Sequence, residues 1–163
     1  MHRGVLELHR SASQATLLSF RRNLQATSVH QRPKERALRS PIAMAHKRIL
    51  ICDDEVTMRQ LLRVVLDGAY EFDEAADGVA ALDLARRRRP DLVILDVMLP
   101  GTGGLAILEA LRADPALAAI PVVVVTAWPQ MEDEALEAGA SRFFMKPFEP
   151  DAMKSAVEEL LHP

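Results

Sequence analysis

The sequence "DLVILDVMLP" at residues 91–100 joins a short apolar run to a single acidic residue, Asp96. Residues 92–95 are apolar at every position, a pattern that predicts a strand buried on both faces rather than one with alternating faces. A carboxylate beside such a strand costs several kcal/mol unless it is paired, hydrated or bound to a metal. The sequence therefore indicates that a specific partner holds Asp96 at the end of this strand.

Other segments with strand-like composition lie before and after this one, and each is followed by apolar residues at helical spacing. We expect strands at 48–52, 70–75, 92–95, 121–125 and 142–145, and helices at 56–66, 78–89, 105–112, 131–138 and 150–161. Residues 70–75 are half polar and suit an exposed edge strand. Five strand–helix units with apolar strands predict an α/β fold, a doubly wound five-stranded parallel sheet covered by helices on both faces.

The composition is that of a globular protein, because 49% of the 163 residues are hydrophobic and 26% are charged. Cys52 is the single cysteine, which excludes an internal disulfide framework and suits a reducing compartment. No apolar run approaches the ~20 residues that a membrane-spanning helix needs. We therefore expect a cytoplasmic protein with no membrane partner.

The first part of the chain differs from the rest in charge. Of the 20 basic and 23 acidic residues, residues 1–43 contain eight and two, which leaves 12 and 21 for the remainder. We interpret residues 1–45 as a basic, disordered N-terminal extension and residues 46–163 as the folded domain. Two alternatives stay open: a transit peptide, suggested by the Arg-rich and acid-poor composition, and, more strongly, a true start at Met44, where "MAHKRILICDDE" leads directly into a strand.

Polar side chains follow four of the five predicted strands. In chain order they are Asp53, Asp54, Asp96, Thr126 and Lys146. The carboxyl ends of parallel strands meet at one edge of the sheet, where ligands bind in folds of this kind. Each residue alone has an ordinary explanation, such as a helix N-cap for an Asp or a surface position for the Lys. Their joint placement instead indicates a shared site.

The chemistry of these side chains favours a divalent cation and a phosphoryl group. Crowded carboxylates repel one another, and a hard cation such as Mg²⁺ relieves that repulsion through oxygen ligands. A metal, a lysine and a hydroxyl together suit a phosphoryl group. We predict that Asp96, on the middle strand, is the nucleophile that accepts it.

Four motifs, in order, resemble the receiver domain of two-component response regulators. They are "LICDDE" (50–55), "DLVILDVMLPGTGG" (91–104), "VVVVTAW" (122–128) and "FFMKPF" (143–148), and the resemblance runs from about Lys47 to Leu161. It implies the flavodoxin-like (βα)5 fold of the chemotaxis regulators, with strand order 2-1-3-4-5.

The resemblance also implies a role for each acidic residue. Asp96 would be the phosphoacceptor, and its phosphoryl group would come from a sensor histidine kinase or a histidine phosphotransfer protein. Mg²⁺ would be held by Asp53, Asp54, Asp96 and the backbone carbonyl of Met98.

Three residues in or directly after the last two predicted strands have implied roles in binding and signalling. Thr126 would hydrogen-bond the phosphoryl group, and Lys146 would pair with one of its oxygens, with a cis bond between Lys146 and Pro147. Phe143 would act with Thr126 as a switch and alter the face of the fourth helix, fifth strand and fifth helix for a downstream protein target.

Two features depart from the family pattern, and the first is the spacing of 20 positions between Thr126 and Lys146, which is shorter than in most receivers. Pro129 falls where the fourth helix should begin, so we expect that helix to be short or displaced. In addition, Met98 and Trp128 lie two residues after Asp96 and Thr126. The resemblance implies that these positions line the water's approach to the phosphoryl group. We predict that these bulky apolar side chains slow hydrolysis of the aspartyl phosphate.

The sequence is compatible with more than one function. Two residues follow Leu161, so we expect no covalently attached DNA-binding domain, and we interpret the protein as a stand-alone switch or phosphorelay intermediate rather than a turnover enzyme. One alternative is a receiver-like interaction module that is not phosphorylated. Another is a Mg²⁺-dependent phosphatase of the haloacid dehalogenase type, although those enzymes place an Asp where Met98 lies. Neither the G-x-G-x-x-G fingerprint nor the P-loop pattern of nucleotide-binding proteins occurs in the sequence.

Overall fold

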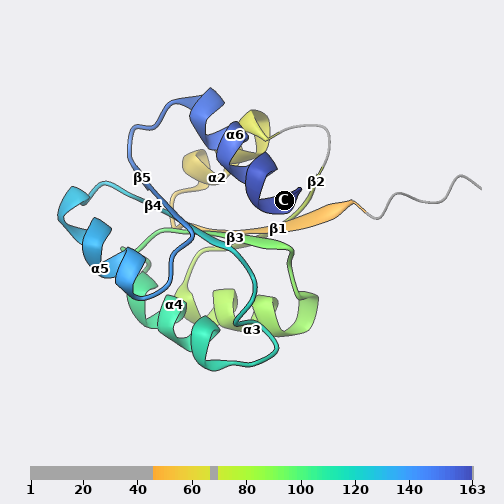
Figure 1. Cartoon of the computed structure of the whole chain (residues 1–163), viewed down its shortest axis with the longest axis vertical. Coiled ribbons are helices and arrows are strands. Elements are labelled where there is room, and N and C mark those ends of the chain that lie inside the picture. The colour runs from red at the N-terminus through yellow and green to blue at the C-terminus, as the bar shows by residue number, and fades with distance from the viewer. Residues whose placement is uncertain (1–45, 67–69, 163) are drawn as a thin grey trace, which may run out of the picture. The chain divides into compact units, whose positions relative to one another are not determined.

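The computed structural model describes residues 46–66 and 70–162. Strands and helices alternate along them (Figure 1), in the order β1 (Lys47–Cys52), α2 (Val56–Val65), β2 (Tyr70–Ala75), α3 (Gly78–Arg88), β3 (Leu92–Leu95), α4 (Gly104–Ala113), β4 (Val122–Thr126), the 3-10 turn η1 (Pro129–Met131), α5 (Glu132–Glu137), β5 (Arg142–Met145) and α6 (Pro150–Leu161). The interpretation of residues 1–45 as a basic extension lies outside the described residues.

The five strands form one parallel sheet in the order β2-β1-β3-β4-β5. The register pairs Ile51 of β1 with Ile94 of β3, and Leu95 of β3 with Val124 of β4. All four residues of β3 are buried, as expected for the central strand, whereas the edge strand β2 is mostly half-buried. The predicted fold class and strand order are therefore confirmed.

Apolar side chains of the sheet pack into two separate clusters, one on each face. On one face α2 and α6 contribute residues such as Leu62, Met153 and Val157. On the other face α3, α4 and α5 contribute residues such as Ala81 and Leu108. Figure 1 shows these two groups of helices on opposite sides of the sheet. The carboxyl ends of the strands are left as an edge between the two layers.

The segment after β4 shows the effect of Pro129. This residue occupies the first position of η1, and α5 follows with only six residues. Proline is tolerated in the first turn of a helix but cannot donate the backbone hydrogen bond that an interior position requires. The prediction of a short fourth helix is confirmed.

Within residues 46–66 and 70–162, no helix is long and apolar enough to cross a membrane. The described helices are amphipathic elements that bury one face against the sheet, as the two clusters indicate.

Candidate functional site

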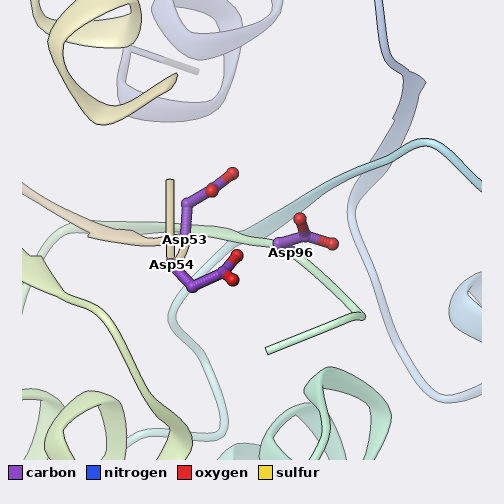
Figure 2. A group of neighbouring side chains, drawn as sticks. All are labelled: Asp53, Asp54 and Asp96. Carbon is purple, nitrogen blue, oxygen red and sulfur yellow. The ribbon is translucent and has the colours of Figure 1, made fainter. Parts of the chain in front are cut away.

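Three carboxylates meet where β1 and β3 end. One oxygen from each of Asp53, Asp54 and Asp96 lies within 4.8 Å of the others. Figure 2 shows these side chains gathered at the ends of the two neighbouring strands. Asp53 and Asp96 are only 2% and 6% exposed, while Asp54 is exposed to solvent. The structure therefore brings together the three residues that the sequence predicted as metal ligands.

Lys146 explains how Asp96 is held beside a buried strand. Its Nζ donates to Asp96 Oδ2 at 2.6 Å and to Asp53 Oδ2 at 2.7 Å. Burial lowers the pKa of Lys146, but its hydrogen bonds and charge interactions with Asp53 and Asp96 outweigh burial, and the net result is a raised pKa. The sequence at residues 91–100 indicated that Asp96 has a specific partner. Among the described residues, that partner is the ammonium group of Lys146.

Backbone amides orient the side chains at three strand ends in the same way. Asp96 Oδ1 accepts from the amide of Met98 at 2.9 Å, two residues later. The same spacing links Asp53 Oδ1 to the Glu55 amide at 2.9 Å, and Thr126 Oγ1 to the Trp128 amide at 3.4 Å. Such bonds fix the first residue of the turn that leaves each strand. The role of the Met98 carbonyl in metal binding stays a prediction.

The predicted switch residues lie on neighbouring strands. Thr126 is fully buried at the end of β4, and its carbonyl accepts from the Lys146 amide at 2.7 Å. Phe143 on β5 pairs in register with Val124 and packs, partly buried, against the cluster beneath α3, α4 and α5. The Lys146–Pro147 peptide bond is cis, as the resemblance implied.

The loop after Asp96 depends on a glycine at the start of α4. A Cβ on Gly104 would lie 2.3 Å from both the Asp96 carbonyl oxygen and Val97 Cα. The Gly104 amide instead donates to the Val97 carbonyl at 2.9 Å. Only a residue without a side chain permits this approach, so Gly104 fixes how the backbone leaves Asp96.

One arginine at the site was not predicted from the sequence. Arg59, on α2, donates through Nη1 to the carbonyls of Asp53 and Asp54, and through Nε to Glu74 on β2. An arginine near the start of a helix is usually solvent-facing, so its position alone carried little signal. One sequence signal could have identified Arg59. It lies six residues after Asp53, and so in the first turns of the helix that follows β1.

The donor set fits a hard divalent cation. The three converging groups offer only carboxylate oxygens, which Mg²⁺ prefers, and neither a thiolate nor an imidazole belongs to the cluster. Cys52, next to Asp53, is buried, and burial raises the pKa of its thiol, which suits a core residue rather than a ligand.

The strand order and the polar residues at the carboxyl edge define a flavodoxin-like α/β protein. The family model described as response regulator receiver domain matches residues 49–158. This chain therefore belongs to the response regulator receiver family, whose domains serve in signalling.

Curated relatives are similar over the receiver region. The DNA-binding response regulator MtrA of Mycolicibacterium paratuberculosis is 41% identical over 119 residues, which cover 71% of this chain and 51% of the relative. Sporulation initiation phosphotransferase F of Bacillus subtilis is 37% identical over 121 residues, covering 72% of this chain and 96% of the relative. This chain thus spans about half the length of MtrA and nearly all of the sporulation protein.

These relatives correct one expectation from the sequence. We expected no covalently attached DNA-binding domain because two residues follow Leu161. Relatives named DNA-binding response regulators match this chain over only about half of their own length. The DNA-binding dual master transcriptional regulator RpaA of Synechocystis likewise matches over 48% of its length. The expectation is therefore wrong, because the end of a receiver sequence does not indicate what accompanies it.

Solved structures show the same architecture. A putative response regulator from Chloroflexus aurantiacus superposes with a TM-score of 0.68 at 34% identity, covering 72% of this chain and 98% of that one. The CheY-like receiver domain protein from Methanospirillum hungatei gives a TM-score of 0.65 at 28% identity, covering 71% and 93%.

Proposed function

We propose that this protein is a phosphorylation switch in which Asp96 accepts a phosphoryl group in a Mg²⁺-dependent reaction. The observation that carries the proposal is the pairing of a nearly buried carboxylate, Asp96, with Lys146 and two further carboxylates at the edge of the sheet. A carboxylate in this position is a nucleophile with a cation beside it. Membership of the receiver family supports the same function.

The donor in this proposal is a phosphohistidine on a sensor kinase or a phosphotransfer protein. An Asp96 carboxylate oxygen forms the new bond to phosphorus, the bond from phosphorus to the histidine nitrogen breaks, and the histidine leaves with its electron pair. Bound Mg²⁺, held by Asp53, Asp54, Asp96 and the Met98 carbonyl, would neutralise charge on the phosphoryl oxygens. Lys146, now paired with two carboxylates, would donate to one of those oxygens.

The signal in this proposal begins at Thr126. Its hydroxyl, which at present accepts from the Trp128 amide at 3.4 Å, would donate to the phosphoryl group. Phe143, on the adjoining strand and only partly buried, would repack as Thr126 moves. The change would bias a two-state equilibrium of the surface formed by α5, β5 and α6 and so alter binding of a downstream protein.

We place the receiver domain at residues 46–163 and the protein in the cytoplasm. The family match at residues 49–158 supports the domain boundaries. The chain has a single cysteine, which is buried at the end of β1, and this low cysteine content supports a reducing compartment.

The test is intact-mass analysis after incubation with Mg²⁺ and acetyl phosphate. Wild type is expected to gain one hydroxylamine-labile phosphoryl group, and Asp96→Asn none. Asp91→Asn is a matched control, because Asp91 lies at the other end of β3, where it accepts from Lys47. A folded wild type that gains no group from acetyl phosphate or from a phosphorylated histidine donor would favour an interaction module instead.

A further inference from the structure

One arginine joins three segments beside the acidic cluster. Arg59 Nη1 donates to the carbonyl of Asp53 at 2.7 Å and to that of Asp54 at 3.3 Å. Its Nε donates to Glu74 Oε2 on β2 at 2.9 Å. The side chain is only 12% exposed, although it carries a full charge. Arg59 thus links the first turns of α2, the turn after β1 and the edge strand β2.

The two carbonyls belong to consecutive residues that both supply carboxylates to the cluster. A carbonyl oxygen shares a rigid plane with the peptide group that follows it. Holding the carbonyls of Asp53 and Asp54 with one donor therefore fixes two successive peptide planes. The two planes flank Asp54, and the first of them also follows Asp53, so they fix the direction of the Asp54 Cα–Cβ bond and restrict that of Asp53. Both carboxylates extend from these bonds.

Glu74 in turn holds the guanidinium in place. Its carboxylate accepts from Arg59 through Oε2, and the hydrogen bond from Arg59 is the largest influence that lowers the pKa of Glu74. The next residue of β2, Ala75, accepts from the Asp53 amide at 3.1 Å. The turn is thus tied to β2 both directly and through Arg59.

A neighbouring arginine, Arg63, forms an exposed ion pair with the same carboxylate, Glu74. Arg63, one turn further along α2, donates to Glu74 Oε1 at 3.0 Å and is 54% exposed. Within the described residues, the Arg63 side chain donates to that carboxylate and not to the turn that carries Asp53 and Asp54. Exposed pairs of this kind contribute little. Arg59 and Arg63 therefore form a natural comparison.

We propose that Arg59 is a positioning residue, which orients Asp53 and Asp54 for a divalent cation through their backbone carbonyls. The inference rests on the proposed function, because it concerns the same Mg²⁺ site. Metal ligands generally depend on such supporting hydrogen bonds, and loss of one typically weakens metal affinity by about 10- to 100-fold.

Positioning by Arg59 strengthens Mg²⁺ binding, whereas its positive charge weakens it. The direction in which a substitution changes the Mg²⁺ affinity therefore tests the inference. A cation next to the acidic cluster repels Mg²⁺, so removal of the charge alone would tighten binding. Loss of positioning would weaken binding. Arg59→Lys keeps the charge but loses the planar fork that contacts two carbonyls and a carboxylate. Arg59→Met loses both and keeps similar bulk.

The experiment titrates MgCl2 into the full chain by calorimetry, without a phosphodonor. Arg59→Lys and Arg59→Met are expected to weaken Mg²⁺ binding by about tenfold, while Arg63→Lys and Arg63→Met stay within about twofold of wild type. The rate of phosphorylation by acetyl phosphate is then followed against Mg²⁺ concentration. The half-saturating concentration should rise about tenfold, whereas the rate at saturating Mg²⁺ changes far less.

The outcomes separate the possibilities. Folded Arg59→Lys protein with wild-type or tighter Mg²⁺ affinity overturns the inference, as does an equal loss in the Arg63 variants. If Arg59→Met does not fold, Arg59→Lys and Glu74→Gln keep the test open, since Glu74→Gln should weaken Mg²⁺ binding in the same direction. If the wild type neither binds Mg²⁺ nor accepts a phosphoryl group, the proposed function itself is wrong. If the wild type does both and Arg59→Lys binds Mg²⁺ with the same affinity, only the role of Arg59 is wrong.

Discussion

The two halves of the sheet edge are held in place differently. We define the acidic half as the ends of β1 and β3, with Asp53, Asp54 and Asp96. Here Arg59 donates to two backbone carbonyls, and the start of α4 at Gly104 lies against the backbone of Asp96 and Val97. Each carboxylate-bearing turn is therefore fixed through its main chain.

We define the response half as the ends of β4 and β5, with Thr126, Phe143 and the segment that follows β4. Within residues 46–66 and 70–162, the Thr126 hydroxyl accepts one hydrogen bond, from the Trp128 amide at 3.4 Å. Helix α5 has only six residues, and of these Ala135 is buried. Among the described residues no side chain caps the N-terminus of α5. The groups proposed to bind are thus fixed, and the groups proposed to move have fewer restraints.

The largest expected effect comes from breaking the acidic half at Gly104. Its added Cβ in Gly104→Ala would lie 2.3 Å from main-chain atoms, which cannot move aside as a side chain can. We expect the free energy of unfolding to fall by about 3 kcal/mol, the upper part of the range for overpacking. Urea unfolding followed by circular dichroism measures it.

Gly78 is the matched control, because it too is the first residue of a helix. A Cβ there would meet Ile107 Cδ1 and Thr102 Cβ at 3.0 Å, both side-chain atoms. Gly78→Ala should therefore change the unfolding free energy by at most about 1 kcal/mol. If the two substitutions lower the free energy of unfolding equally, the close approach of Gly104 to the backbone of Asp96 and Val97 is not a tighter restraint than the side-chain contacts of Gly78.

The next largest effect concerns Lys146, which joins the two halves. In Lys146→Met two nearly buried carboxylates lose their ammonium partner, so we expect a loss of roughly 2 kcal/mol without metal at pH 7. The raised pKa of Lys146 means that its contribution is fully present below its usual value of about 10.4 and is lost as pH rises through the folded value. Unfolding in urea at pH 7 and pH 11 tests both statements.

Lys47→Met serves as its control. Lys47 pairs with Asp91 at 3.0 Å, but both side chains are more than one-third exposed. The expected loss is below about 0.5 kcal/mol. If Lys146→Met is no more destabilising than Lys47→Met, the two halves are not joined through this ammonium group.

A smaller effect is expected on β2, where Glu74 supports the acidic half. Arg59, and then Arg63, hold the pKa of Glu74 below its ordinary value. The stability from this ion pair is therefore present above about pH 4.3 and is lost as pH falls through the lowered folded pKa. We expect Glu74→Gln to cost roughly 1 kcal/mol at pH 7 and nothing in strong acid. A pH-independent difference in unfolding free energy would contradict this.

Much of the fold could be predicted because strand burial is a local signal. The four apolar residues of β3 and the run in β4 exclude an alternating strand, and their alternation with helical segments then requires a parallel sheet. The sequence ranges predicted for β2, β3, β5 and α6 match the structure. Pro129 gave the short α5 for the same reason, since its effect on a helix acts within one turn.

The site was predictable only where residue type determines position. Asp53, Asp96 and Lys146 end their strands, so topology alone brings them together. Arg59 acts on main-chain carbonyls and through Glu74 of another strand, which depends on the side-chain path across α2. Gly104 acts by the close approach of two backbones. Residue types alone reveal neither pattern, because both depend on tertiary contacts, and for Arg59 the spacing from Asp53 is the one sequence signal.

The smallest expected effect concerns Met98 and Trp128, which flank the site in the two halves. Their side chains are 54% and 47% exposed, and their backbone amides already bind Asp96 and Thr126. Met98→Asn and Trp128→Ala leave those amides in place and remove apolar cover. We expect each to shorten the lifetime of the aspartyl phosphate about threefold, or about 0.7 kcal/mol in the barrier.

The decay of the phosphorylated mass after removal of the donor measures this lifetime. Met145→Ala is the control, because Met145 on β5 is similarly apolar and 50% exposed and adjoins Lys146. Within the described residues, its backbone amide donates no hydrogen bond to a side chain of the site. Unchanged lifetimes in Met98→Asn and Trp128→Ala would mean that water reaches the phosphoryl group independently of both. A shorter lifetime in only Trp128→Ala would place the control of hydrolysis in the response half, where the restraints on movement are fewer.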